Sequence, residues 1–370
     1  MIERLQIKNF KSIKELELDC RRVNVFIGEP DTGKSNILEA LGLLSWCGHG
    51  YDAGKQDHPL MVSDYLSPSP ATFDYGKFDR NTYGGMRRKS GLEHYVRFQN
   101  IENLFNDNTR AQPITISLNN ADKNISVHLS VEQEQYTFSA SIQHLEKESV
   151  EVISTTDSSG DLTGEQKKIP SLDPIRFYRF KDITEFSDPR SAFLMPPYGQ
   201  NMFAVVTRHE KLKKTMQNFF SGRKFKFVIN QSEKRFGFQE EENGVVTSYP
   251  YIISSDTLRH IVFFALAIES NKDATLVFEE PESHAFPYYT KWLGERIALY
   301  SNNQFFIATH NPYLLSALVE KTKIRDLNVV VTYMQDYQTK TITLTDDQIG
   351  EIMVEEPFFN LSRYIPGERA

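Results

Sequence analysis

Residues 28–35 read Gly-Glu-Pro-Asp-Thr-Gly-Lys-Ser and directly follow the apolar, β-branched run from Val23 to Ile27. This spacing is that of the P-loop, G-x-x-x-x-G-K-[ST], whose backbone N–H groups surround phosphate oxygens. The pattern requires a strand before the loop and a helix after it, and the apolar run from Ile37 to Leu44 supplies the helix. The stretch therefore predicts an α/β protein that binds a nucleoside triphosphate with Mg²⁺, rather than an ordinary Gly-Lys-Ser turn.

Each position of this segment has a predicted task. Gly28 and Gly33 allow the turn and a close backbone approach to the phosphates. Lys34 is expected to reach the β- and γ-phosphates, and the Ser35 hydroxyl is expected to ligate Mg²⁺. The helix that starts near Lys34 directs its positive dipole end at the same phosphates. The candidate nucleotide contacts here are Gly28, Glu29, Pro30, Asp31, Thr32, Gly33, Lys34, Ser35 and Asn36.

Bulk properties limit the class of protein. The 370 residues, 39% of them hydrophobic, suffice for one large domain with an insertion or for two domains. The net charge of −7 means that any nucleic-acid contact requires a local basic patch. Cys20 and Cys47, without a Cys/His cluster, fit a reduced protein without a zinc site. No apolar run approaches the roughly 20 residues of a membrane span. We therefore expect a soluble, cytoplasmic protein without membrane contact.

A second acidic motif lies far downstream. Residues 275–282 read Thr-Leu-Val-Phe-Glu-Glu-Pro-Glu, an apolar strand that ends in two carboxylates, as in a Walker B motif. Such strands place acidic groups at the carboxyl edge of a parallel sheet, where ligands bind. Glu279 is the candidate Mg²⁺ ligand, because Mg²⁺ prefers hard oxygen donors. Glu280 is the candidate to orient or deprotonate the attacking water. The alternative is a solvated strand end.

Two further segments complete the set of motifs. The strand-like run 304–308 is followed by Thr-His-Asn-Pro, where His310 is the candidate contact to the γ-phosphate or the attacking water; alternatively it is a structural histidine. Ser254, Ser255 and Asp256 precede an apolar helix-like run from His260 to Glu269, and they form either a functional segment or a helix N-cap. The candidate catalytic residues are Lys34, Glu280 and His310.

These four stretches occur in the order of an ABC-type ATPase head: Walker A, signature, Walker B with an adjacent glutamate, and switch histidine. More narrowly, the chain resembles the SMC/RecF/OLD-like ATPases in its opening Met-Ile-Glu-Arg-Leu-Gln-Ile-Lys-Asn-Phe-Lys-Ser-Ile and in Gly-Lys-Ser-Asn-Ile-Leu-Glu-Ala-Leu at 33–41. Glu-Glu-Pro-Glu-Ser-His at 279–284 and Thr-His-Asn-Pro-Tyr-Leu-Leu at 309–315 are similar to the OLD-like branch. The resemblance covers about residues 1–48 and 250–320.

The resemblance implies an α/β P-loop NTPase of the ABC-ATPase head type, with a mixed central sheet, an antiparallel β subdomain and a large insertion. We expect residues 1–48 and 250–370 to form the two parts of the head. Residues 49–249 are expected to hold the antiparallel subdomain together with an irregular and helical insertion. Segments 49–90 contain many Gly, Asp, Ser and Pro residues and predict irregular structure. Met202 to Phe220 predicts one helix.

The resemblance also implies that two heads sandwich ATP, with Ser254 as the signature serine that contacts the γ-phosphate bound by the other head. Asp256 stands where the family pattern has a glycine. A carboxylate there would repel the phosphate unless it is turned away or bridged by a cation. Either Ser254 and nearby N–H groups make the contact, or the sandwich is unusual. A homodimer or higher homo-oligomer is the implied assembly.

The implied function is an ATP-hydrolysing head that controls a separate effector protein, such as a nuclease or toxin, or acts on nucleic acid, in anti-phage defence or DNA repair. The alternative is a nucleotide-gated scaffold with little or no ATP turnover. No sustained heptad pattern and no TOPRIM-like acidic cluster occur, so neither coiled-coil arms nor a fused nuclease is expected. A small-molecule kinase and a transporter ATPase are disfavoured by the Glu-Glu-Pro-Glu and Thr-His-Asn-Pro segments and by the absence of a Gly-rich signature.

Four further candidates each have two possible interpretations. The stretch 208–226 combines basic residues with phenylalanines and is either a nucleic-acid contact or an exposed helix face; 87–89 is a second basic candidate. Gln99 is either a Q-loop residue or a solvated loop glutamine. Arg22 is either a contact to the base or phosphates or an ordinary surface arginine.

Overall fold

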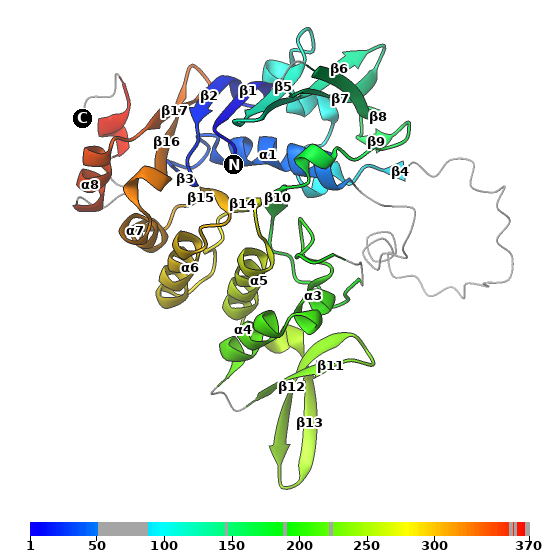
Figure 1. The fold of residues 1–370 in the computed structure, drawn as a ribbon, viewed down its shortest axis with the longest axis vertical. Coiled ribbons are helices and arrows are strands. Elements are labelled where there is room, and N and C mark those ends of the chain that lie inside the picture. The colour runs from blue at the N-terminus through cyan, green and yellow to red at the C-terminus, as the bar shows by residue number, and fades with distance from the viewer. Residues whose placement is uncertain are drawn as a thin grey trace, which may run out of the picture.

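Three β-sheets organise the chain in the computed structural model (Figure 1). The structure describes residues 1–50, 88–144, 147–187, 191–221, 225–354, 358 and 361–366. Most of the predicted irregular insertion, as well as Arg87, Arg223 and Lys224 of the two basic candidates, lies outside the described residues.

The central sheet has six strands and is parallel except at one edge. The apolar run Val23–Ile27 forms an interior strand of this sheet, and all five of its residues are buried. A strand that is covered on both faces is expected to be apolar throughout, so the sequence predicts this position. The strands are, in spatial order, β10 (Ile175–Tyr178), β14 (Thr275–Glu279), β15 (Gln304–Ala308), β3 (Val23–Ile27), β16 (Leu327–Gln335) and the antiparallel edge strand β17 (Gln338–Thr343).

The second sheet has eight antiparallel strands, and alternating residues on its central strands are buried. This period of two is expected for a sheet that covers a core on one face. The strands are, in spatial order, β2 (Ile13–Asp19), β1 (Arg4–Phe10), β5 (Ile114–Asn119), β6 (Lys123–Glu132), β7 (Gln135–His144), β8 (Lys147–Thr156), β9 (Asp161–Leu162) and β4 (Arg88–Lys89).

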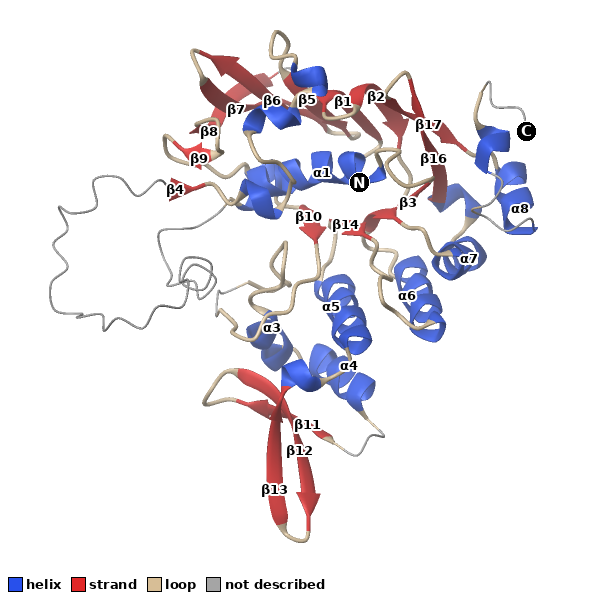
Figure 2. Cartoon of the chain, turned by 180° about the vertical axis from the view of Figure 1, so that it is seen from behind, coloured by secondary structure: helices blue, strands red, loops and turns tan. Residues whose placement is uncertain are grey.

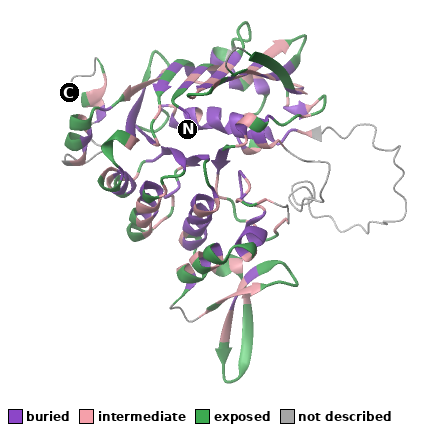
Figure 3. Cartoon of the chain, viewed as in Figure 1, coloured by how far each residue is buried: buried purple, intermediate pink, exposed green. Residues whose placement is uncertain are grey.

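Helix α1 (Lys34–His49) lies between these two sheets and is buried on nearly all sides (Figure 3). Its apolar residues join one core cluster with both sheets, so the helix that carries the P-loop is fixed from two directions. Trp46 is fully buried, packs edge-on against Phe138 of β7 at 5.0 Å between ring centroids and donates from Nε1 to the carbonyl of Ser90 at 2.8 Å.

Three helices cover the opposite face of the central sheet, as seen in Figures 1 and 2: α5 (Asp256–Ser270), α6 (Pro287–Leu299) and α7 (Pro312–Lys321). A small three-stranded sheet projects beyond them and packs on α3 and α4. The remaining elements are α3 (Met202–Arg208), α4 (Glu210–Phe220), β11 (Lys226–Asn230), β12 (Arg235–Glu242), β13 (Val245–Pro250) and α8 (Asp346–Val354). Together these elements confirm the predicted fold class.

The prediction of one helix from Met202 to Phe220 is wrong in one respect. His209 has φ −120° and ψ 105°, an extended conformation that divides the segment into α3 and α4. The Thr207 hydroxyl donates to the carbonyls of Phe203 and Ala204, and such side-chain bonds compete with the backbone ladder of a helix. Among the described residues, no helix is long and apolar enough to cross a membrane.

Replacing Trp46 tests how strongly α1 is held. We expect Trp46→Ala to lower the free energy of unfolding by about 3–5 kcal/mol, because it removes a large buried side chain and leaves a cavity. Leu299→Ala, at a position that is 70% exposed, is the matched control and should change it by less than about 0.5 kcal/mol. Denaturant titration measures both, and equal losses would contradict the packing role of Trp46.

Candidate active site

The carboxyl ends of three neighbouring parallel strands bring the predicted motifs together. Glu279, the last residue of β14, pairs with Ala308 of β15, and Ala308 pairs with Phe26 of β3. The backbone continues this alignment, since the N–H of Glu280 donates to the carbonyl of Ala308 at 3.0 Å. The Walker A loop, the acidic pair and the switch segment therefore start from one edge of the sheet, where open α/β sheets bind ligands.

The P-loop turns tightly because three of its residues, Gly28, Asp31 and Gly33, have positive φ. Gly33 has φ 94°, and a Cβ atom there would lie 1.9 Å from Oγ1 of Thr339, so only glycine is accommodated. Asp31 has φ 60°. The N–H groups of the first turn of α1 have no partners within the helix, which leaves them available to an anion.

Lys34 is buried inside this loop. Its ammonium donates to the carbonyls of Gly28 at 2.9 Å and Glu29 at 2.6 Å. Burial lowers the pKa of Lys34 to about 8, although the nearby carboxylates of Glu280 and Asp31 oppose the shift. The lysine is thus held within the loop that is predicted to bind phosphate.

The two predicted Mg²⁺ ligands are adjacent. The side chain of Ser35 hydrogen-bonds to Glu279, and each carboxylate oxygen of Glu279 accepts from a different guanidinium: Arg97 at 2.9 Å and Arg179 at 3.1 Å. Burial would raise the pKa of Glu279, but the Ser35 hydroxyl and the two guanidinium groups hold it below its usual range. Glu279 is therefore an ionised carboxylate, the form that ligates a divalent cation.

Glu280 and His310 face each other beside Lys34. His310 Nε2 lies 3.7 Å from Glu280 Oε1, and the Ser283 hydroxyl donates to the other oxygen at 3.1 Å. Burial and the Lys34 ammonium lower the pKa of His310, while Glu280 raises it. Glu280 has φ 43° and a half-exposed side chain. A strained, partly exposed carboxylate beside an imidazole is suited to hold a water molecule for attack.

The residues present are compatible with ATP and Mg²⁺. A hydroxyl and an ionised carboxylate in mutual contact offer the hard oxygen donors that Mg²⁺ takes, with phosphate oxygens and water completing its shell. The described residues contain no group of three or more His, Cys, Asp or Glu side chains arranged to hold a metal by themselves. A metal at this site would therefore depend on the nucleotide for most of its ligands.

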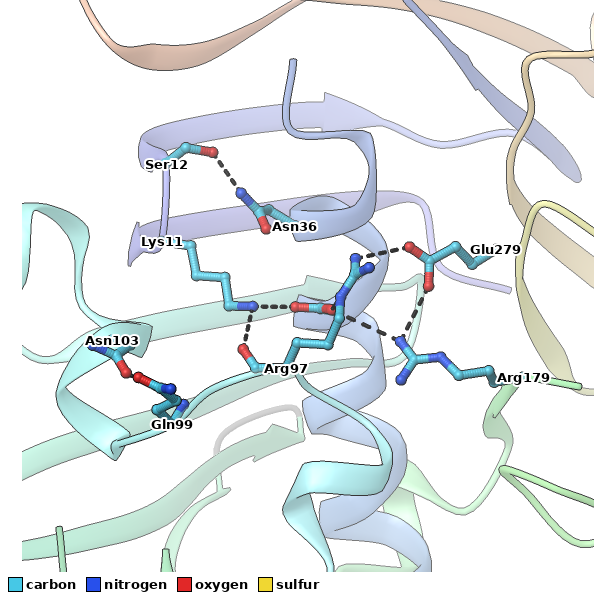
Figure 4. Close-up of polar contacts among 9 residues, drawn as sticks. Lys11, Ser12, Asn36, Arg97, Gln99, Asn103, Arg179 and Glu279 are labelled. Carbon is cyan, nitrogen blue, oxygen red and sulfur yellow. Dashed lines mark hydrogen bonds and ion pairs between the residues drawn. The ribbon is translucent and has the colours of Figure 1, made fainter. Parts of the chain in front are cut away.

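Some candidates lie elsewhere. The side chain of Asn36 is turned toward the end of β1 and donates to Ser12 at 2.7 Å (Figure 4). Arg22 precedes β3, at the end opposite the P-loop, and donates to carbonyls that end α6, including Ala298 at 2.9 Å; these contacts favour the alternative in which Arg22 does not touch the nucleotide. Gln99 lies beside Asn103, and its loop reaches Glu279 through Arg97 instead (Figure 4).

In the predicted signature segment, the Asp256 carboxylate is paired with a cation of its own chain. This carboxylate accepts from Arg259 at 2.5 Å, and Arg259, nearly buried, also donates to Asp182 at 2.8 Å and 3.1 Å. Asp256 is therefore bridged by a cation. The Ser254 hydroxyl donates to the carbonyl of Tyr251 at 2.9 Å, within its own turn before α5. Ser255 is the N-cap residue of α5 but makes no side-chain cap bond.

The phenylalanines of the basic stretch serve packing. Phe220 is buried, and Phe219 packs edge-on against Trp292 at 4.9 Å between centroids. Several of its lysines are engaged as well, since Lys211 donates to the Tyr300 hydroxyl at 2.7 Å and Lys213 lies 3.5 Å from Glu210. These contacts favour the exposed helix face over a stacking platform for bases.

Sequence reasoning missed the charged residues that surround Glu279. One feature of the sequence could have indicated them. Glu39 is the single acidic residue in the otherwise apolar run that follows the P-loop, and it is fully buried, so it requires cationic partners. Its partners Lys11, Arg97 and Arg179 come from three distant segments, so no local pattern joins them.

The fold and these motifs define a P-loop ATPase of the ABC head type. The chain belongs to the AAA ATPase domain family, whose model matches residues 1–242. It is similar to a protein of Helicobacter pylori named ATP/GTP phosphatase, with 22% identity over 403 residues that cover 100% of this chain and 99% of the relative. It is also similar to an uncharacterized protein of Methanocaldococcus jannaschii, 42% identical over 52 residues, or 14% of this chain and 24% of that protein.

Solved structures give a weaker likeness. The SMC head bound to the C-terminal winged-helix domain of ScpA has a TM-score of 0.46 at 12% identity, covering 95% of this chain and 99% of that one. The SMC head domain from Thermotoga maritima has a TM-score of 0.38 at 13% identity, covering 93% and 99%.

Glu282, next to the site, gives a pH-dependent prediction. Burial raises the pKa of this carboxyl to about 7; its Oε1 accepts from Thr309, and its Oε2 has no protein partner. Because the folded state holds the proton more tightly, its contribution to stability is full below the ordinary pKa and is lost as the pH rises toward 7. We expect Glu282→Gln to match the parent near pH 4.5 and to exceed its stability by on the order of 3 kcal/mol at pH 8.

Denaturant titrations between pH 4.5 and pH 8 measure this difference. Glu148→Gln, at an exposed position of β8, is the matched control and should follow the pH profile of the parent. A constant offset between Glu282→Gln and the parent at all pH values would contradict the titration of Glu282 in this range.

Proposed function

We propose that this chain hydrolyses ATP with Mg²⁺, closes as a dimer on ATP and controls a separate effector protein, such as a nuclease or toxin, or acts on nucleic acid, in anti-phage defence or DNA repair. The observation that supports hydrolysis is the meeting of Lys34, Ser35, Glu279, Glu280 and His310 at one sheet edge. Family membership supports the ATPase class. The cellular role rests on resemblance to OLD-like ATPases.

In this proposal each side chain has one task. Lys34 binds the β- and γ-phosphates, and Ser35 and Glu279 hold Mg²⁺, which neutralises charge on the transferred phosphoryl group. Glu280 accepts a proton from the attacking water. His310, 3.7 Å from Glu280, donates a hydrogen bond to the γ-phosphate or orients that water.

Exposed aromatic side chains support a dimer through this face. Phe286 and Tyr288, after the acidic pair, are 67% and 68% exposed, and Tyr313, at the start of α7, is 55% exposed. Ile252 and Ile253, before α5, are also exposed. Apolar side chains gathered around a site mark a surface for association. A second copy of the chain would cover them and bring its own Ser254 toward the nucleotide.

Lys34→Ala tests nucleotide binding. We expect ATP affinity to fall by roughly 10- to 100-fold, because the variant loses charge-assisted hydrogen bonds to the phosphates. Titration with a fluorescent ATP analogue measures the affinity, with Lys321→Ala of α7 as the exposed control. Unchanged affinity in Lys34→Ala would overturn the assignment of the P-loop.

Glu280→Gln tests hydrolysis separately from binding. We expect ATP to bind normally, phosphate release to fall by roughly 10²- to 10⁴-fold, and an ATP-dependent dimer to accumulate, since only the proton acceptor is lost. Phosphate release and light scattering after size exclusion measure these effects, and Glu320→Gln is the exposed control. A normal rate in Glu280→Gln would remove its catalytic role. A parent protein that binds ATP without releasing phosphate would favour the nucleotide-gated scaffold.

A further inference from the structure

Five charged side chains from separate segments form one network at the inner end of the site (Figure 4). Glu39 of α1 is at its centre and binds Lys11, Arg97 and Arg179, while Arg97 and Arg179 also bind Glu279. Lys11 further donates to the carbonyl of Arg97 at 2.7 Å. The network therefore joins the turn after β1, α1, the loop of Arg97 and the ends of β10 and β14.

Glu39 is the fixed point of this network. It is fully buried in α1, and a buried carboxylate is costly unless cations and hydrogen bonds compensate it. Arg97 Nε donates to it at 2.5 Å. Arg97 is therefore held to Glu39 strongly, whereas its second contact, to the less buried Glu279, is the one that can be exchanged at lower cost.

Two kinds of cation, guanidinium groups and the proposed metal ion, compete for the Glu279 carboxylate. Arg97 occupies Oε1 and Arg179 occupies Oε2 of the carboxylate that contacts Ser35. The same carboxylate is the proposed Mg²⁺ ligand, so direct metal ligation competes with a guanidinium for the oxygen. The Nη2 group of Arg97, on a side chain that is 58% exposed, can exchange Glu279 for water more easily than Arg179 can, at 24% exposed, while Arg97 Nε stays on Glu39.

We propose that Arg97 is an exchangeable cation at the metal site: when the metal–nucleotide complex binds, Glu279 passes from Arg97 to the metal ion, and Glu39 keeps the Arg97 guanidinium beside the bound phosphates. This inference rests on the proposed ATPase function and adds how its metal site is loaded. Arg97 is a positioning residue here, and Glu39 is its anchor.

The net charge of the network determines whether the metal ion binds before or together with the nucleotide. Three cations and two carboxylates leave one net positive charge (3 − 2 = +1). A divalent cation alone adds to a positive site, whereas the polyphosphate of ATP neutralises it. Metal therefore binds weakly without nucleotide and tightly with it.

Mn²⁺ binding to the full chain tests the exchange, measured by electron paramagnetic resonance with and without a non-hydrolysable ATP analogue. In the presence of the analogue, Arg97→Gln should bind Mn²⁺ roughly tenfold more tightly than the parent, because one charge-assisted hydrogen bond no longer competes. Thermal unfolding and metal-free binding of the analogue verify that the variant is folded. If Arg97→Gln does not fold, Arg97→Lys, which keeps the charge at Glu39 without the guanidinium fork, should shift the affinity in the same direction.

Lys11→Gln is the matched control, because Lys11 binds Glu39 without contacting Glu279. It removes one positive charge from the network but no competitor for the metal, so it should tighten Mn²⁺ binding much less than Arg97→Gln. Equal tightening in both variants would mean that only the local field matters and would overturn the exchange. Unchanged or weaker Mn²⁺ binding in Arg97→Gln would overturn it as well.

Mn²⁺ binding to the parent protein distinguishes a failure of the proposed ATPase function from a failure of the Arg97 exchange alone. If the parent binds no Mn²⁺ even with the ATP analogue, the proposed ATPase function fails and the exchange fails with it. If the parent binds Mn²⁺ only with the analogue but Arg97→Gln matches it, the exchange alone fails.

Discussion

The structure depends on the burial of α1 between two sheets. A helix that is apolar around most of its circumference has no stable place on a surface and must be covered on several sides. The antiparallel sheet and the central sheet provide that cover, and Trp46 and Leu41 belong to the shared core. Because α1 cannot shift without disturbing both sheets, the loop before it and the carboxylate of Glu39 within it are fixed relative to β14 and β15.

That fixed position brings three separate motifs, the P-loop, the acidic pair and the switch segment, into one site. Lys34 and Ser35 start α1, Glu279 ends β14, and His310 follows β15, so their separation is set by strand register rather than by flexible loops. Positive φ values at Glu280 and Gly33 produce sharp turns of the backbone after β14 and before α1. Strain of this kind persists only where the surrounding packing enforces it, which here is the rigid sheet edge.

The sequence predicted those parts of the fold that depend on local pattern. The P-loop, the strands β3, β14 and β15, and a helix over His260 to Glu269 were expected because apolar period, turn residues and acidic strand ends lie close together in the chain. The helix in the structure, α5, begins four residues earlier, at Asp256. The charged partners of Glu279 could not be expected in this way. Arg97 lies 182 residues from Glu279, and Arg179 lies 100 residues from it, so only the tertiary fold joins them. Arg22 shows the converse: it lies close to the P-loop in sequence but at the other end of β3, so closeness along the chain does not bring it to the site.

Helix α5 is tied to the turn after β14, which carries Glu280, within the same chain. Thr257 of α5 donates to the carbonyl of His284 at 2.6 Å, and the His260 ring contacts the backbone of Glu280 and Pro281 while it packs on Phe180. Burial lowers the pKa of His260 to about 4, so the ring is neutral and tolerates this apolar contact. The Arg259 bridge between Asp182 and Asp256 fixes the first turn of the same helix. Direct contacts therefore join the turn of Glu280 to the start of α5, and under the proposed function they are the physical route from hydrolysis to the surface that carries Ser254.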